Sequence, residues 1–321
     1  MIQKKSKVTK NPIKKKRKKS AQLAKRAKKL RKKAITPFQA LAFYVNNYYD
    51  IQDLRIRTES RFENLKRDYK VPKNLQVNIS KDNREYRQTE AWLKNKILKE
   101  LDHYPVWTEW LKDIKGIGPC LAGGLIAWLR EIKRFKTVSA VFRYCGIGMI
   151  TRCKTCKKRI EPNPSGWINR RAGQRVVFLA RVKKLSVKKQ KMELIKWKKK
   201  YKAYLCTCQN PQPYDVIQKR TKGEESDWSS KLKTHCWKIS SSFIKTKGGY
   251  RRHYDKVKAV IASKHSDFSK GHIDNQARRK TVQLFISHLF VQWNQLEGRP
   301  YISPYPIAKL GHTHYIAPFN S

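Results

Sequence analysis

Four cysteines in the middle of the chain have the types and the spacing of a metal site. Cys153 and Cys156 form a CxxC pair, and Cys206 and Cys208 form a CxC pair further along. Tetrahedral Zn²⁺ prefers soft ligands such as thiolates, and a turn with paired cysteines presents two of them at once. We therefore expect one structural zinc ion in a zinc-ribbon-like segment. The alternative is a set of free thiols, and His235 with Cys236 is a substitute source of ligands.

A second pair of residues suggests nuclease chemistry only weakly. His312 and His314 flank Thr313, as in some metal or HNH-type nuclease sites. No strand–strand–helix order accompanies them, and no carboxylate pair has a spacing suited to catalytic Mg²⁺. We therefore expect binding rather than catalysis, although an enzyme stays open as an alternative.

The charge of the chain points to a polyanionic partner. It carries 75 Lys and Arg against 23 Asp and Glu, for a formal net charge of +52. This excess favours nucleic acid and argues against a typical small-molecule enzyme. Hydrophobic residues make up 39% of the chain, enough for a folded core. No apolar run reaches the roughly 18 residues of a membrane span, and no N-terminal signal is visible. We expect no membrane partner and a cytoplasmic protein, either nucleoid-associated or encoded by a virus or mobile element.

The elements that must position these groups are expected to be mostly helices. Residues 1–33 hold 17 Lys or Arg and no acid, which predicts a disordered basic arm over 1–35; a solvated tail is the alternative. A hairpin or coiled-coil region follows over 36–105, opened by Thr36 as N-cap and Pro37. A helical domain occupies 106–150 and 216–321, interrupted by a Cys-bearing basic insertion over 151–215. Periodicity predicts helices at Ile51–Tyr69, Thr89–Leu101, Val106–Ile114, Cys120–Leu129, Val138–Tyr144, Leu232–Phe243, Tyr250–Ala262 and Asp274–Leu296.

A glycine turn joins two of these helices and is a candidate phosphate site. Lys115, Gly116 and Gly118 precede Pro119, where the next helix is expected to begin. Glycines let backbone N–H groups approach a phosphate, and a helix N-terminus adds a positive partial charge. The alternative is a turn whose glycines serve packing alone.

Other cations lie among aromatic residues, as in proteins that stack unpaired bases and bind phosphates. The alternative for each patch is a solvated helix face. The candidates are Arg130, Lys133, Arg134 and Lys136 near the turn; Arg170 and Arg171 beside Trp167; Lys198, Lys199 and Lys200 beside Trp197; Arg251 and Arg252 beside Tyr250; and Lys270, Arg278, Arg279 and Lys280.

The segment Ile114–Gly146, with its sequence IKGIGPCLAGGLIAWL, resembles the Nop-domain core of box C/D ribonucleoproteins. It is also similar to the C-terminal domain of the bridge-RNA-guided DEDD insertion-sequence transposases. The blocks Leu232–Lys258 and Ser269–Tyr305 look like later helices of the same module. With a basic N-terminus and no nuclease domain in view, the chain most resembles the Tas proteins of tandem interspaced guide RNA systems.

This resemblance implies a guide RNA, a DNA target and a homodimer, with DNA recognised through base pairing. Together with the residue patterns above, it leads us to expect a mostly α protein, in which a Nop-like domain carries a zinc-ribbon-like insertion and a disordered basic arm. Because no acidic constellation for catalysis is visible, we expect no nuclease activity of its own. Two departures keep alternatives open. The four acidic residues of the transposases are missing, and their nucleophilic Ser has only Ser165, before Gly166, as a counterpart. The alternatives are a transposase or recombinase-type enzyme and a structural RNA-binding protein of a ribonucleoprotein.

Overall fold

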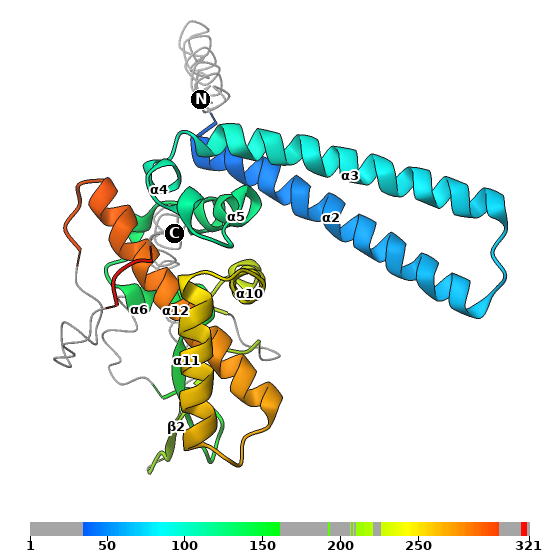
Figure 1. Ribbon diagram of the computed structural model, residues 1–321. Helices are drawn as coiled ribbons and strands as arrows, with labels where there is room; N and C mark the ends of the chain where they lie inside the picture. Colours follow the sequence, from blue (N-terminus) through cyan, green and yellow to red (C-terminus); the bar gives the residue numbers. More distant parts are fainter. Residues whose placement is uncertain are drawn as a thin grey trace, which may run out of the picture.

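The structure of the protein is a computed structural model that describes residues 35–160, 192, 206, 208, 210–220, 226–301 and 316–319. In these segments the chain is mostly helical, with one two-stranded sheet, which confirms the expected fold class (Figure 1). Residues 1–34 of the expected arm and most of the insertion lie outside the described residues.

A long helical hairpin projects from the rest of the protein (Figure 1). Helix α2 spans Pro37–Asp68 and helix α3 spans Lys73–Leu101. The expected N-terminal signal is present, because the side chains of Thr36 and Gln39 cap α2 in a reciprocal capping box. Ion pairs join the two helices near the middle of the hairpin, including Arg55–Glu90 at 2.6 Å.

Helix α3 corrects the prediction of a helix restricted to Thr89–Leu101, because it begins at Lys73. Residues 73–88 are rich in polar residues and lack the apolar stripe that marks a helix in a sequence. They are helical because they run along α2, so the hairpin itself supplies the missing stabilisation.

Helix α5, Pro119–Leu129, lies at the centre of the core between the hairpin and helix α10, Ser230–Lys245. Two adjacent glycines of α5 allow the hairpin and α10 to pack closely against this helix. A Cβ at Gly123 would lie 2.8 Å from Ile97 of α3, and a Cβ at Gly124 would lie 2.4 Å from the ring of His235 on α10. The small residues of α5 therefore serve close helix packing.

We expect Gly124→Ala to destabilise the protein by about 1–3 kcal/mol, because the new methyl group must displace the buried imidazole of His235. Gly271→Ala is a matched control, since a Cβ at this helical position meets no atom within 4 Å. Urea unfolding of the two variants measures the difference. Equal stability of the two would contradict the packing described for α5.

The expected helix Val106–Ile114 is wrong in detail. The chain instead forms α4, Pro105–Thr108, and a short 3-10 helix η1, Leu111–Asp113. The break between them lets Trp110 stack on Phe285 at 5.9 Å between ring centroids. Tertiary packing of the large aromatic side chains thus overrides the local helical pattern.

The remaining helices surround this core. They are η2, Ile132–Arg134; α6, Val138–Tyr144; α11, Gly249–Lys264; and α12, Lys270–Leu296. Helix α12 begins four residues before the expected Asp274, because the side chain of Ser269 accepts a hydrogen bond from the His272 N–H and caps the helix. As a result, Lys270 lies in the first turn of a long helix. No helix among the described residues is long and apolar enough to cross a lipid bilayer.

Candidate functional site

The four cysteines come together where a two-stranded ladder ends. Strand β1, Met149–Cys153, pairs antiparallel with β2, Pro213–Ile217, and Cys153 lies opposite Pro213. A tight turn follows, in which the Lys157 N–H donates to the Cys153 carbonyl at 2.9 Å and Lys157 has a positive φ of 58°. The Cys206 N–H donates to the Arg159 carbonyl at 2.9 Å, which places the second cysteine pair beside the first.

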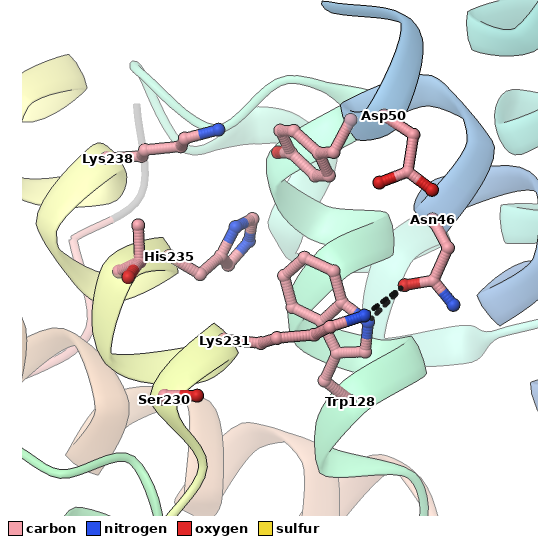
Figure 2. Close-up of a pocket in the computed structure, with 9 residues that line it drawn as sticks. Asn46, Asp50, Trp128, Ser230, Lys231, His235 and Lys238 are labelled. Carbon is pink, nitrogen blue, oxygen red and sulfur yellow. Dashed lines mark hydrogen bonds between the residues drawn. The ribbon is translucent and has the colours of Figure 1, made fainter. Parts of the chain in front are cut away.

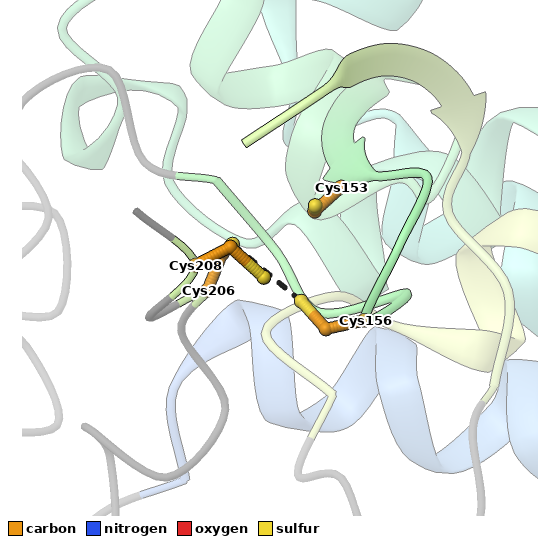
Figure 3. Close-up of side chains that lie close together, drawn as sticks. All are labelled: Cys153, Cys156, Cys206 and Cys208. Atoms are coloured by element: carbon orange, nitrogen blue, oxygen red, sulfur yellow. Dashed lines mark hydrogen bonds between the residues drawn. The ribbon is translucent and has the colours of Figure 1, made fainter. Parts of the chain in front are cut away.

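The geometry of this cluster suits a tetrahedral metal ion (Figure 3). All four Sγ atoms lie within 4.8 Å of one another, and those of Cys156 and Cys206 are 3.5 Å apart. Zn–S bonds of about 2.3 Å in a tetrahedron require S···S separations of about 3.8 Å. The four cysteines can therefore hold a metal ion with small adjustments of their side chains.

The four thiols differ in how readily they lose a proton. Hydrogen bonds from the backbone, first from Cys156 and also from Thr155 and Gln212, lower the pKa of Cys153 to about 6. The neighbouring thiols, Cys206 first and then Cys156, raise the pKa of Cys208 to about 12. The four sulfurs therefore cannot all be thiolates near neutral pH unless a cation offsets their repulsion.

The glycine turn has one packed and one open glycine. Gly116 has φ +96°, its carbonyl accepts a hydrogen bond from Ser242 at 2.6 Å, and a Cβ there would lie 2.8 Å from Thr246. Gly118 is the N-cap of α5 and has no neighbour within 4 Å of a would-be Cβ. Gly116 thus serves the contact with α10, while Gly118 leaves the start of α5 open.

A second helix N-terminus lies beside this turn. The Cβ of Lys115 is 3.0 Å from the place where a Cβ of Gly248 would be, and Gly248 is the N-cap of α11. Lys115 in the glycine turn is exposed, and so is Arg252 in the first turn of α11. The fold therefore brings together two candidate phosphate-binding segments that are far apart in the sequence.

The cations that follow α5 are also exposed but lie at its other end. Arg130 is the C-cap with a φ of 62°, and Lys136 is exposed in the loop beyond η2. Lys133 pairs with Glu131 at 2.9 Å, and Arg134 lies over the ring of Tyr144 at 4.3 Å. A rise of about 1.5 Å per residue puts Arg130 some 16 Å from the glycine turn. These residues form a second patch.

Among the cations of α11 and α12 that the sequence marks as candidates, three are engaged by the protein itself. Arg251 bonds to Asp255 at 2.8 Å. Arg278 bonds to Asp274 at 2.6 Å and lies over the ring of Trp237 at 4.6 Å. Arg279 is half-buried beside Met149, and this burial lowers the pKa of its guanidinium. Lys270 and Lys280 are exposed. The four expected α12 cations therefore do not form one free surface.

Several candidates from the sequence lie outside the described residues. These are Arg170, Arg171, Lys198, Lys199 and Lys200 of the insertion, together with Ser165, His312 and His314.

A pocket between α2, α5 and α10 has no counterpart among the sites predicted from the sequence (Figure 2). Its aromatic wall consists of Tyr49, Trp128 and His235, and Lys231 and Lys238 lie at its border. The signal was present, because Lys231, His235 and Lys238 recur at i, i+4 and i+7 and so share one face of α10.

The fold and the cysteine cluster define this chain as a strongly basic, mostly helical protein with the geometry of a four-cysteine metal site. Residues 108–155 match the family model described as Transposase IS116/IS110/IS902 family. The matched segment contains the glycine turn, α5, α6 and Cys153 at the end of β1. This supports a relation to transposases of that type. No curated protein matches the chain.

Proposed function

We propose that this protein binds a guide RNA and recognises DNA through base pairing of that RNA, without nuclease activity of its own. The observation that carries the proposal is the match of residues 108–155 to a transposase family in a chain of net charge +52. Base pairing then reads the DNA sequence, while the protein holds backbone and shape. A homodimer that carries the RNA and a structural Zn²⁺ on the four cysteines belong to the same proposal.

The neighbouring starts of α5 and α11 support a phosphate-binding role. Lys115 and Arg252 add two exposed charges to two helix N-termini, which favour anions. The patch of Arg130 and Lys136 lies one helix length away, which suits an extended backbone better than a single small anion.

The family match also favours a second candidate, a transposase-type enzyme whose metal site needs groups from elsewhere. Within the described segments, the residues that gather as possible metal ligands are the four cysteines, a set typical of structural zinc rather than of Mg²⁺ chemistry. Incubation of the purified protein with RNA, DNA and Mg²⁺ tests this candidate, and cleavage abolished by Ser165→Ala would favour it over our proposal.

Deletion of residues 1–33 provides a test of the basic arm. We expect weaker binding to every nucleic acid by a similar factor, and a shallower dependence of affinity on salt, because each neutralised duplex phosphate contributes a slope of about −0.9. Affinities measured over a series of KCl concentrations give this slope. An unchanged slope after deletion would remove the arm from the binding surface.

A further inference from the structure

The pocket between α2, α5 and α10 combines an aromatic wall with cations, and neither the zinc cluster nor the two phosphate-binding patches uses it. Its volume is about 270 Å³. The rings of Trp128 and His235 meet edge to face at 4.9 Å, and those of Tyr49 and Trp128 are 5.7 Å apart. Figure 2 shows the rings of Trp128 and His235 projecting from two different helices toward one another, and Tyr49 of α2 completes the wall.

The wall is built to be rigid. The Trp128 indole N–H donates to the Asn46 side-chain carbonyl at 3.2 Å, and the Tyr49 hydroxyl donates to the Cys120 carbonyl at 3.2 Å. His235 bonds through Nε2 to the Leu121 carbonyl at 2.8 Å and rests on Gly124. Burial lowers the pKa of His235 to about 4, so its ring is neutral at physiological pH. An aromatic surface fixed in this way loses little entropy when a flat ring stacks on it.

The charges at the border select the kind of ligand. Lys238 lies 4.0 Å from the centre of the Tyr49 ring, whereas Lys231 lies 6.0 Å from that of Trp128, at the outer limit of such a contact. The Lys231 ammonium also donates to the Asn46 side-chain carbonyl at 3.2 Å, and the half-buried Trp128 exposes part of its indole to the pocket. Two lysines against the single carboxylate of Asp50 disfavour a cationic ligand, although aromatic cages can also hold quaternary ammonium groups.

The size of the pocket limits which ligands can fit. A volume of about 270 Å³ is below the range of roughly 300–1,000 Å³ that is usual for cofactor sites. It suits one flat heterocycle with a phosphate at the border, and both lysines are within reach of that border. One nucleotide of a strand meets these requirements.

We propose that this pocket, here called the base pocket, takes up one unpaired nucleobase of a bound strand, stacked on Trp128, with its phosphate between Lys231 and Lys238. The inference rests on the proposed nucleic-acid binding and adds a residue-level contact for an unpaired base. A paired base cannot enter, because its face is covered by the duplex stack. The base pocket thus distinguishes single strands from duplexes.

The test uses the full chain and a short single-stranded RNA that carries 2-aminopurine, whose fluorescence falls when it stacks. We expect quenching by the protein, and roughly a tenfold loss of single-strand affinity in Trp128→Ala. Trp128→Phe retains an aromatic face and is expected to recover most of the affinity. We expect Lys231→Glu to lower single-strand affinity more than Lys264→Glu, a control with the same charge change at an exposed residue in the last turn of α11.

Thermal unfolding first establishes that each variant is folded. If Trp128→Ala does not fold, Lys231→Glu still tests the pocket. Equal losses for a single strand and a duplex of the same length, or equal effects of Lys231→Glu and Lys264→Glu, would overturn the base pocket. Equally tight binding of free AMP would overturn the assignment to a strand. None of these results would contradict the proposed function. That function is tested separately, by the identity of the copurifying RNA and by its pairing with DNA.

Discussion

Protein purified without chelator is expected to contain one Zn²⁺ per chain, and Cys153→Ser or Cys206→Ser is expected to remove it. The two residues belong to different cysteine pairs. Either change leaves only three sulfur ligands in a cluster whose Sγ atoms lie within 4.8 Å of one another. Structural zinc contributes about 10–16 kcal/mol of apparent binding free energy in small zinc-finger domains. Elemental analysis of the wild type and the two variants measures the metal content.

Loss of this metal is also expected to loosen the β1–β2 ladder, because the cysteines close its end. Backbone amides of the ladder, such as that of Tyr214 opposite Arg152, then exchange faster with solvent after chelation. Cys120→Ser is a matched control, since Cys120 lies on α5 outside the cluster. Wild-type protein free of zinc, or zinc retained equally by Cys153→Ser and Cys120→Ser, would contradict the assignment of the ligands.

The cysteine cluster was predictable because paired cysteines carry their own geometric signal. CxxC and CxC turns each bring two sulfurs together, so the sequence leaves only the meeting of the two pairs to the fold. That meeting depends on the β1–β2 ladder and on the bond from Cys206 to Arg159, neither of which has a clear local pattern. The four clustered cysteines could therefore be named from the sequence, but their place in the fold could not.

The cations illustrate the opposite case. Arg278 and Lys280 lie two residues apart on α12 and look alike in the sequence. Only the structure separates them, because Arg278 is bound by Asp274 and Trp237 while Lys280 is exposed. Charge density predicts the class of partner, since every cation adds to the field, but not which side chains are free to meet it. The base pocket was missed for a related reason, because its three rings come from three helices.

The result with the largest consequence is a defined small RNA that copurifies with the protein and directs it to matching DNA. We expect duplex DNA that matches part of this RNA to bind roughly a hundredfold or more tightly than unmatched duplex of equal length. Strand exchange is nearly balanced, with stacking of about 1.4 kcal/mol per step on each side, so mismatches carry the cost. Sequencing of the bound RNA, followed by competition at near-physiological salt, measures this preference.

Charge reversal at the exposed candidates tests whether the protein holds that RNA through the surfaces described above. Arg278 and Arg279 are unsuitable because their loss also disturbs α12, so the variant changes four exposed residues to Glu, namely Lys115, Arg130, Lys136 and Arg252. The control makes the same four charge changes on the outer hairpin, at Arg61, Lys70, Lys81 and Arg84. We expect loss of RNA in the first variant and retention in the second, because position and not only net charge decides binding to a folded RNA. Heterogeneous cellular RNA in the wild type, or equal losses in the two variants, would reduce the protein to a non-specific binder of polyanions.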